Sequence, residues 1–250
     1  MLPVAPSKTS PSCAAGLVFA VPIEADAFAR AASDVVEVEA DGLTFCEGQV
    51  GGRRVAWCVA GVGCAAAARA TQLLIDGHRP RLLVSAGFAG GLELALPRGS
   101  VVEPAAVRGE PQPGDAVRLA AAAEGSGTLV TVDRIVGTPA EKAALAAATG
   151  ARLVDMETLA VAQVATAAGL PCRSVRVISD AAGDELPRDV SRLVAPQSTL
   201  RRAGAVLGMI GRRPRAAVDL WQLWERAVVD GRTLADALVR LCRSLPAEPR

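Results

Sequence analysis

The stretch that decides the fold is RVAWCVAGVGCAAAARATQLLIDGHRPRLLVSAGFAGG, from Arg54 to Gly91. Its first seven residues form an apolar run that is typical of a strand buried on both faces. A tight turn at Gly61–Gly63 and an alanine-rich helix over 64–76 follow, and a second buried strand over 81–86 leads into five residues rich in glycine. This order predicts a parallel βαβ unit whose glycines let a ligand approach the backbone closely.

The same alternation of strand and helix extends on both sides of this unit. The apolar run 17–21 precedes an acidic helix start at Ile23, and alternating residues between 35 and 50, broken at Asp41-Gly42, predict a strand or hairpin. Further strands are expected near 100–106, 128–132, 152–155 and 173–179, with a helix over 158–168. Alternation of this kind predicts an α/β fold with a mostly parallel sheet and helices on both faces.

Composition narrows the class of protein. The chain has 250 residues, 51% hydrophobic and 21% charged, which is enough to bury a large core. A net charge of +1 and 3% aromatic residues disfavour nucleic-acid binding. Six scattered cysteines without a CxxC pair, and a single histidine, His78, disfavour a disulfide framework or a metal centre. We expect a cytoplasmic protein without metal or cofactor, and with no apolar segment of about 18 residues that could span a membrane.

The chain is expected to have one large domain with two flanking parts. Residues 1–14 are predicted to be a disordered leader, residues 15–210 the domain, and residues 211–250 an amphipathic helical extension with a final helix of about 25 residues. Its apolar stripe consists of Leu220, Leu223, Trp224, Ala227, Val228, Leu234, Leu238 and Leu241. The stripe is expected to pack on the domain or on a partner subunit, with contact to a membrane surface as the alternative. His78 is expected to be a solvated loop residue, and 182–198 a loop beside the site.

Three carboxylates follow predicted strands and have apolar neighbours: Glu24, Glu157 and Asp180. The carboxyl ends of parallel strands meet at one edge of a sheet, where ligands bind. A carboxylate in apolar surroundings tends to have a raised pKa, which suits a general acid or base. The alternative is that each acid only complements the positive end of a helix dipole.

Four segments carry a family resemblance: VAGVGCAAA (59–67), SAGFAGGL (85–92), VDMETLA (154–160) and RVISD (176–180). In order and spacing they resemble the purine nucleoside phosphorylase/uridine phosphorylase superfamily over about residues 16–185, nearest its methylthioadenosine/S-adenosylhomocysteine nucleosidases. The resemblance implies a three-layer α/β/α domain of the phosphorylase/hydrolase-like type, with a mixed, partly barrel-like central sheet. It also implies a homo-oligomer, most simply a homodimer.

The resemblance also implies roles for particular residues. Glu157 would hydrogen-bond the ribose hydroxyls while Met156 packs on the sugar. Asp180 would protonate or hydrogen-bond the purine N7, and Glu24 would orient or deprotonate the attacking water. The remaining substrate-binding candidates are Gly87, Phe88, Val136 and Ser179, with Val136 in the segment 133–136 that would wrap the adenine.

Departures from the family pattern bear on the reaction and the substrate. Phosphorylases of this superfamily carry an arginine in the segment that corresponds to Ser85–Phe88, and its absence here favours hydrolysis. Phe88 stands where the methylthioadenosine nucleosidases usually have serine, so it would either reshape the pocket or turn into the core. The basic residues Arg212, Arg213 and Arg215, together with the amphipathic helix that follows them, resemble the hopanoid-associated branch of the superfamily. This resemblance makes adenosylhopane an alternative substrate. Two further alternatives are a phosphorylase that holds phosphate on backbone amides of 61–63 and 87–91, and a non-catalytic nucleoside-binding protein.

Overall fold

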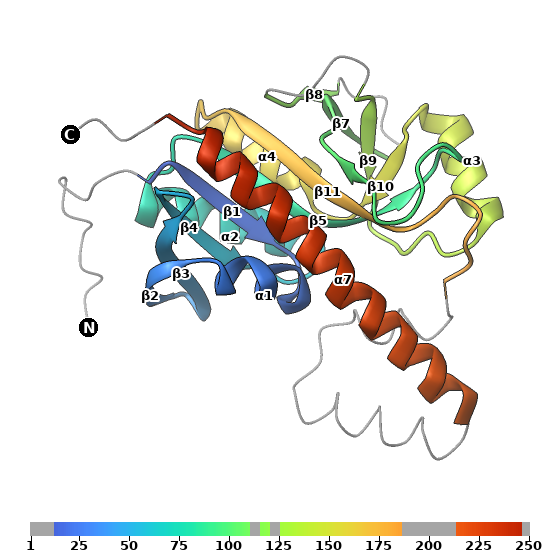
Figure 1. Cartoon of the computed structure of the whole chain (residues 1–250). Helices are drawn as coiled ribbons and strands as arrows, with labels where there is room; N and C mark the ends of the chain where they lie inside the picture. Colours follow the sequence, from blue (N-terminus) through green and yellow to red (C-terminus); the bar gives the residue numbers. More distant parts are fainter. Residues whose placement is uncertain (1–12, 111–115, 121–125, 187–213, 247–250) are drawn as a thin grey trace.

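A mixed sheet forms the middle layer of the molecule (Figure 1). The computed structural model describes residues 13–110, 116–120, 126–186 and 214–246, with side chains of the last helix described from 224 onward. The strands are β1 (Ala15–Phe19), β2 (Ser33–Ala40), β3 (Leu43–Val50), β4 (Arg53–Val59), β5 (Leu83–Gly91), β6 (Val101–Val102), β7 (Ala106–Gly109), β8 (Val117–Arg118), β9 (Thr128–Thr131), β10 (Leu153–Asp155) and β11 (Cys172–Asp180). The helices are α1 (Pro22–Arg30), α2 (Cys64–His78), α3 (Pro139–Thr149), α4 (Thr158–Ala167) and α7 (Pro214–Ser244).

Helices cover both faces of the sheet. The helices α1 and α7 pack together on one face, and α2 and α4 pack together on the other (Figure 1). Each face has its own apolar core: Leu74 and Val161 belong to the α2/α4 side, and Phe28 and Leu238 to the α1/α7 side. The three layers that the family resemblance implied are therefore present.

The pairing of the strands corrects one prediction. The hairpin broken at Asp41-Gly42 is confirmed, because β2 and β3 pair antiparallel across that turn. The sheet is mixed, however, and the mostly parallel sheet expected from alternation alone is wrong. The strand β10 runs antiparallel to β5, and β6 runs antiparallel to β11, while β1 lies parallel between β4 and β5. Hydrophobic periodicity indicates where a strand lies but not in which direction it runs, so the sequence could not predict these antiparallel pairs.

The central strand β5 changes its pairing partner along one edge, which leaves a gap in the sheet. It pairs with β11 along its whole length on one edge. On the other edge it pairs first with β1, through Leu83–Ser85, and then with β10, through Gly90 and Gly91. Among the described residues, no strand pairs with 86–89 on that edge. The sheet is therefore open here, near the carboxyl ends of its strands, where we expected the site.

The C-terminal helix belongs to the core of the domain. Leu234, Leu238 and Leu241 of α7 are buried in the α1/α7 core, whereas Trp224 is exposed. The apolar stripe thus packs on the domain over this half of the helix; Leu220 and Leu223 lie outside the side chains that the structure describes. Within the described ranges, no helix is long and apolar enough to cross a membrane.

Two smaller predictions are corrected at the start of the chain and at the end of α2. Cys13 and Ala14 are buried, and the amide of Ala14 donates to the carbonyl of Arg54 at 2.8 Å, so neither residue belongs to a disordered leader; residues 1–12 lie outside the described part. His78 is not a solvated loop residue. It is buried in the last turn of α2, where its Nδ1 lies 2.6 Å from Oε1 of Glu47.

Candidate functional site

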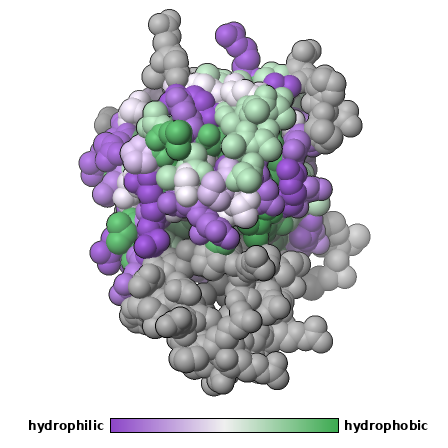
Figure 2. Space-filling model, turned by 90° about the vertical axis from the view of Figure 1, so that its right-hand side faces the viewer, coloured by the Kyte–Doolittle hydropathy of each residue, from purple (hydrophilic) through white to green (hydrophobic). Residues whose placement is uncertain are grey.

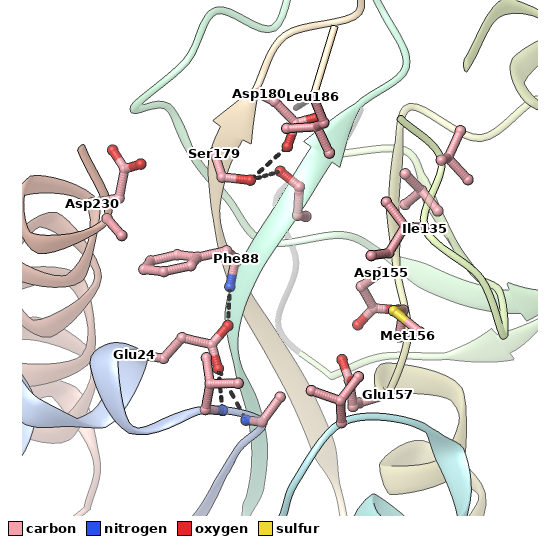
Figure 3. A pocket seen from close by; sticks show the side chains of 18 of the residues that line it. Glu24, Phe88, Ile135, Asp155, Met156, Glu157, Ser179, Asp180, Leu186 and Asp230 are labelled. Atoms are coloured by element: carbon pink, nitrogen blue, oxygen red, sulfur yellow. Dashed lines mark hydrogen bonds between the residues drawn. The ribbon is translucent and has the colours of Figure 1, made fainter. Parts of the chain in front are cut away.

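A cavity of about 300 Å³ lies where the sheet opens. Its lining comes from segments that are far apart in the sequence: Ala20–Glu24 at the start of α1, Val62, Phe88–Gly90 of β5, Arg98, 132–136 after β9, Val154–Glu157 from β10 to the start of α4, Ser179-Asp180 at the end of β11, Leu186, and Arg226–Asp230 of α7. Of the residues singled out from the sequence, Glu24, Phe88, Val136, Met156, Glu157, Ser179 and Asp180 line this cavity. Glu24 and Glu157 lie at one end, and Ser179 and Asp180 at the other (Figure 3).

Glu24 is held by the backbone of two segments. It sits in the first turn of α1, which begins at Pro22, and only 4% of its surface is exposed. Its Oε2 accepts hydrogen bonds from the amides of Ala20 (2.9 Å) and Val21 (3.1 Å), and its Oε1 accepts from the amide of Phe88 (2.8 Å; Figure 3). Burial raises its pKa, while the charge of Arg176 and these three bonds lower it. The result is a fixed carboxylate with a raised proton affinity, which suits a general base.

A fully buried arginine lies beneath this end of the cavity. Nη2 of Arg176 donates to the hydroxyls of Ser85 and Thr158, each at 2.6 Å, and lies 2.7 Å from Oδ2 of Asp155. Arg176 stands within a motif quoted from the sequence, but no role was expected for it. Its apolar neighbours Val175, Val177 and Ile178 were the available signal, because a guanidinium buried among apolar residues requires partners.

Gly87 leaves room for this arrangement instead of lining the cavity. A Cβ atom built on Gly87 would lie 2.4 Å from Nη1 of Arg176 and 2.5 Å from Oε1 of Glu24. These separations are far shorter than atoms tolerate. The glycine therefore allows the carboxylate and the guanidinium to approach the backbone of β5 together.

Glu157 lies at the same end as Glu24, at the N-terminus of α4. Its Oε1 accepts a hydrogen bond from the amide of Gly63 at 2.8 Å. Burial, and then the negative charge of Asp155, raise the pKa of Glu157 to about 7, against the lowering effects of Arg176 and the Gly63 amide. A carboxyl group with a pKa raised in this way can accept a hydrogen bond in its ionised form and donate one in its protonated form. Met156 lies beside it on the cavity wall (Figure 3).

Asp180 is the polar group at the opposite end. The hydroxyl of Ser179 donates to its Oδ1 at 2.7 Å. Its Oδ2 is buried and lies 2.6 Å from Nζ of Lys142, whose side chain is 0% exposed. Neither α3 nor Lys142 was predicted from the sequence, because an alanine-rich segment with one lysine gives no sign that the lysine is buried. The walls between the two ends are apolar and include Ile135 and Val136.

The C-terminal helix closes one side of the cavity. Asp230 of α7 is buried and forms an ion pair with Arg98 at 2.6 Å. Burial raises the pKa of Asp230, and its hydrogen bond with Arg98 lowers it. Phe88 lines the cavity on this side and also packs against the α1/α7 core, so both expectations for its ring hold in part. The sequence analysis did not place α7 at the site.

Metal ligands are not grouped in this region. Within the ranges that the structure describes, no set of three or more His, Cys, Asp or Glu side chains could hold a metal ion.

Comparison with known proteins identifies the family. The model of the Phosphorylase superfamily matches residues 14–110 and 111–211. A futalosine hydrolase from Streptomyces coelicolor is 33% identical over 202 residues, which cover 68% of this chain and 83% of that protein. A 5′-methylthioadenosine/S-adenosylhomocysteine nucleosidase from Listeria monocytogenes is 28% identical over 203 residues, covering 68% and 87%. The chain belongs to the phosphorylase superfamily.

A solved structure agrees in fold. A 5′-methylthioadenosine/S-adenosylhomocysteine nucleosidase from Colwellia psychrerythraea 34H, in complex with adenine, matches with a TM-score of 0.65 and 25% identity, over 74% of this chain and 89% of that one. These relatives place the chain among the nucleosidase-type enzymes of the superfamily. The family resemblance and the mixed α/β fold drawn from the sequence are therefore confirmed.

Proposed function

We propose that this enzyme hydrolyses the N-glycosidic bond of a 5′-substituted adenosine, such as methylthioadenosine or S-adenosylhomocysteine, and releases adenine. The observation that carries the proposal is the separation of carboxyl groups in one cavity, with Glu24 and Glu157 at one end and Asp180 at the other (Figure 3). Their environments differ, and two carboxyl groups held in different environments can act as acid and as base at the same pH.

In the proposed reaction, the base lies between Asp180 and the apolar wall that includes Val136. As the bond between C1′ and N9 breaks, its electron pair moves into the purine, and Asp180 donates a proton to N7. Glu24 takes one proton from a water molecule whose oxygen bonds to C1′. Glu157 holds the ribose hydroxyls, and Met156 packs on the sugar. A proton donor at the leaving group and anionic groups around an oxocarbenium-like centre both lower the barrier.

The backbone amides at the sugar end favour water over phosphate. The amide of Phe88 already donates to Glu24, and the amide of Gly63 already donates to Glu157. These are amides that a phosphorylase without the usual arginine would need for phosphate. Buried carboxylates at this end would also repel a phosphate dianion, and Arg176 is occupied by Asp155 and two hydroxyls.

The test is an assay of nucleobase release by the full chain, with and without phosphate. The substrates are methylthioadenosine, S-adenosylhomocysteine, adenosylhopane and futalosine, the last because of the Streptomyces relative. We expect release without phosphate from one of them, and a loss of several orders of magnitude in Asp180→Asn and Glu24→Gln. Release that strictly requires phosphate would refute hydrolysis. Binding of adenosine derivatives without any release would indicate a non-catalytic nucleoside-binding protein.

A further inference from the structure

Lysine is almost absent from this chain. Lys8 and Lys142 are its two lysines, against 25 arginines. Lys8 lies outside the described residues, and Lys142 is fully buried beside Asp180. Nearly every other basic residue of the chain is an arginine. Among the described residues, however, the cation that contacts the Asp180 carboxylate is a lysine. The chemistry of that position explains the choice.

The ammonium group of Lys142 has three donors and meets three acceptors. Nζ donates to the carbonyl oxygens of Ala181 at 2.7 Å and Asp184 at 3.0 Å, and it lies 2.6 Å from Oδ2 of Asp180. A compact ammonium can satisfy three acceptors that converge on one atom. The guanidinium of arginine is larger and planar, with its donors spread over three nitrogens. This buried position therefore fits lysine and does not fit arginine.

Lys142 also links three parts of the base end of the cavity. It is carried by α3, whose start is fixed by hydrogen bonds between Thr138 and Glu141. The segment directly before α3 lines the cavity with Val136, and the carbonyl of Gly137 accepts from the amide of Leu186 at 2.8 Å. Through Nζ, the helix holds both the Asp180 carboxylate and the loop that follows it.

We propose that Lys142 is a positioning residue for Asp180, an inference that rests on the proposed function. The lysine holds Oδ2 in the protein interior, so that Oδ1, which accepts from Ser179, is the oxygen left for the base. Its positive charge also stabilises the carboxylate that remains after Asp180 has given its proton to N7. Lys142 itself touches neither substrate nor reacting atoms.

Other charged groups near this pair are accounted for. Asp230 of α7 lies near enough for the charge of Asp180 to raise its pKa, and it forms an ion pair with Arg98. Asp184 is exposed, and its carboxylate accepts from the amide of Ala181 at 2.8 Å. Glu141, on α3 itself, is exposed and caps the helix. Lys142 is thus the described cation in direct contact with Asp180.

The experiment compares Lys142→Met with Asp180→Asn and with the double variant, on two substrates. One substrate is the best adenine nucleoside from the assay above. The other is the 4-nitrophenyl riboside with the same 5′ substituent, whose leaving group needs no proton. The matched control is Arg108→Gln, which removes one positive charge from a residue that bonds the other end of α3, at the carbonyl of Thr149. Thermal melts establish that each variant is folded.

For Lys142→Met on the nucleoside, we expect kcat to fall by roughly 100-fold. Turnover of the nitrophenyl riboside should stay within about threefold of the unaltered enzyme, and adding Lys142→Met to Asp180→Asn should change the nucleoside rate little further.

A purely structural role would give a different result. It would lower the rates on both substrates equally and add to the effect of Asp180→Asn. That outcome, or a Lys142→Met variant indistinguishable from Arg108→Gln, would overturn the role of Lys142 alone. Absence of base release by the unaltered enzyme would overturn the proposed function and this inference with it.

Discussion

Replacing Arg176 by methionine is the sharpest test of the polar network beneath the site. The guanidinium is fully buried, lies 2.7 Å from Asp155 and donates to the hydroxyls of Ser85 and Thr158. Methionine is unbranched and apolar, so it fills much of the same space without the charge. The substitution therefore tests the cost of leaving a buried carboxylate without its cation.

The expected loss is large. Removing one partner of a buried ion pair typically costs about 3–5 kcal/mol in the free energy of unfolding. The loss should be smaller at pH 5 than at pH 8. Arg176 lowers the pKa of both Glu24 and Glu157, so without it both pKa values rise further and both ionised carboxylates become more costly. That penalty is present above their pKa values and fades as falling pH protonates the groups.

Equilibrium unfolding of the full chain in urea at pH 5 and pH 8 measures these losses. A double-mutant cycle with Asp155→Asn then isolates the pair. Once the Asp155 charge is gone, Arg176→Met should cost less, and we expect a coupling energy of about 1–3 kcal/mol. A loss below about 1 kcal/mol, or two additive single effects, would refute the view that Arg176 is the central counter-charge of this end.

Three further predictions follow from single positions. Gly87→Ala would place a Cβ against Glu24 and Arg176, so we expect a loss of about 1–3 kcal/mol in a urea melt and a fall of at least roughly 100-fold in kcat; a variant with unchanged kcat would contradict the packing argument. The raised pKa of Glu157, about 7 against an ordinary 4.5, makes its ionisation destabilising as pH rises through that range, so Glu157→Gln should gain stability relative to the unaltered chain between pH 5 and pH 8; equal differences at both pH values would argue against it. Thr138→Ala should cost about 1 kcal/mol in urea unfolding, because it removes the cap of α3; no measurable loss would show the cap to be dispensable.

Local sequence signals predicted much of the fold and one part of the site. Apolar runs ended by glycine or proline marked β1, β4 and β5, and each signal depends on a few adjacent residues. Because strands of an α/β sheet end at a common edge, the same signals predicted that Glu24, Glu157 and Asp180 would lie close together, and all three line one cavity. Position relative to a strand end was enough to find them.

The missed features depend on packing between distant segments. Lys142 reaches carbonyls 39 and 42 residues away, and nothing in its alanine-rich neighbourhood indicates burial. Asp230 reaches the cavity only because α7 folds back across the sheet (Figure 1). His78, in the last turn of α2, is buried with Glu47 of the distant strand β3 as its partner. The scarcity of lysine in the chain was the one sequence signal that could have drawn attention to Lys142.

The two buried cations divide the cavity into two electrostatic environments. Arg176 lies at the sugar end, where it opposes the effect of burial on Glu24 and Glu157, and burial still raises the pKa of both. Lys142 lies at the base end and contacts Asp180 alone among the three acids. The two ends therefore differ in the cation that lies beside their carboxyl groups. On the side of the molecule that carries α3, hydrophobic residues form a broad area with hydrophilic residues around it (Figure 2). Changing Lys142 should therefore alter proton delivery to the base and leave Glu24 unchanged, whereas changing Arg176 should alter the sugar end first.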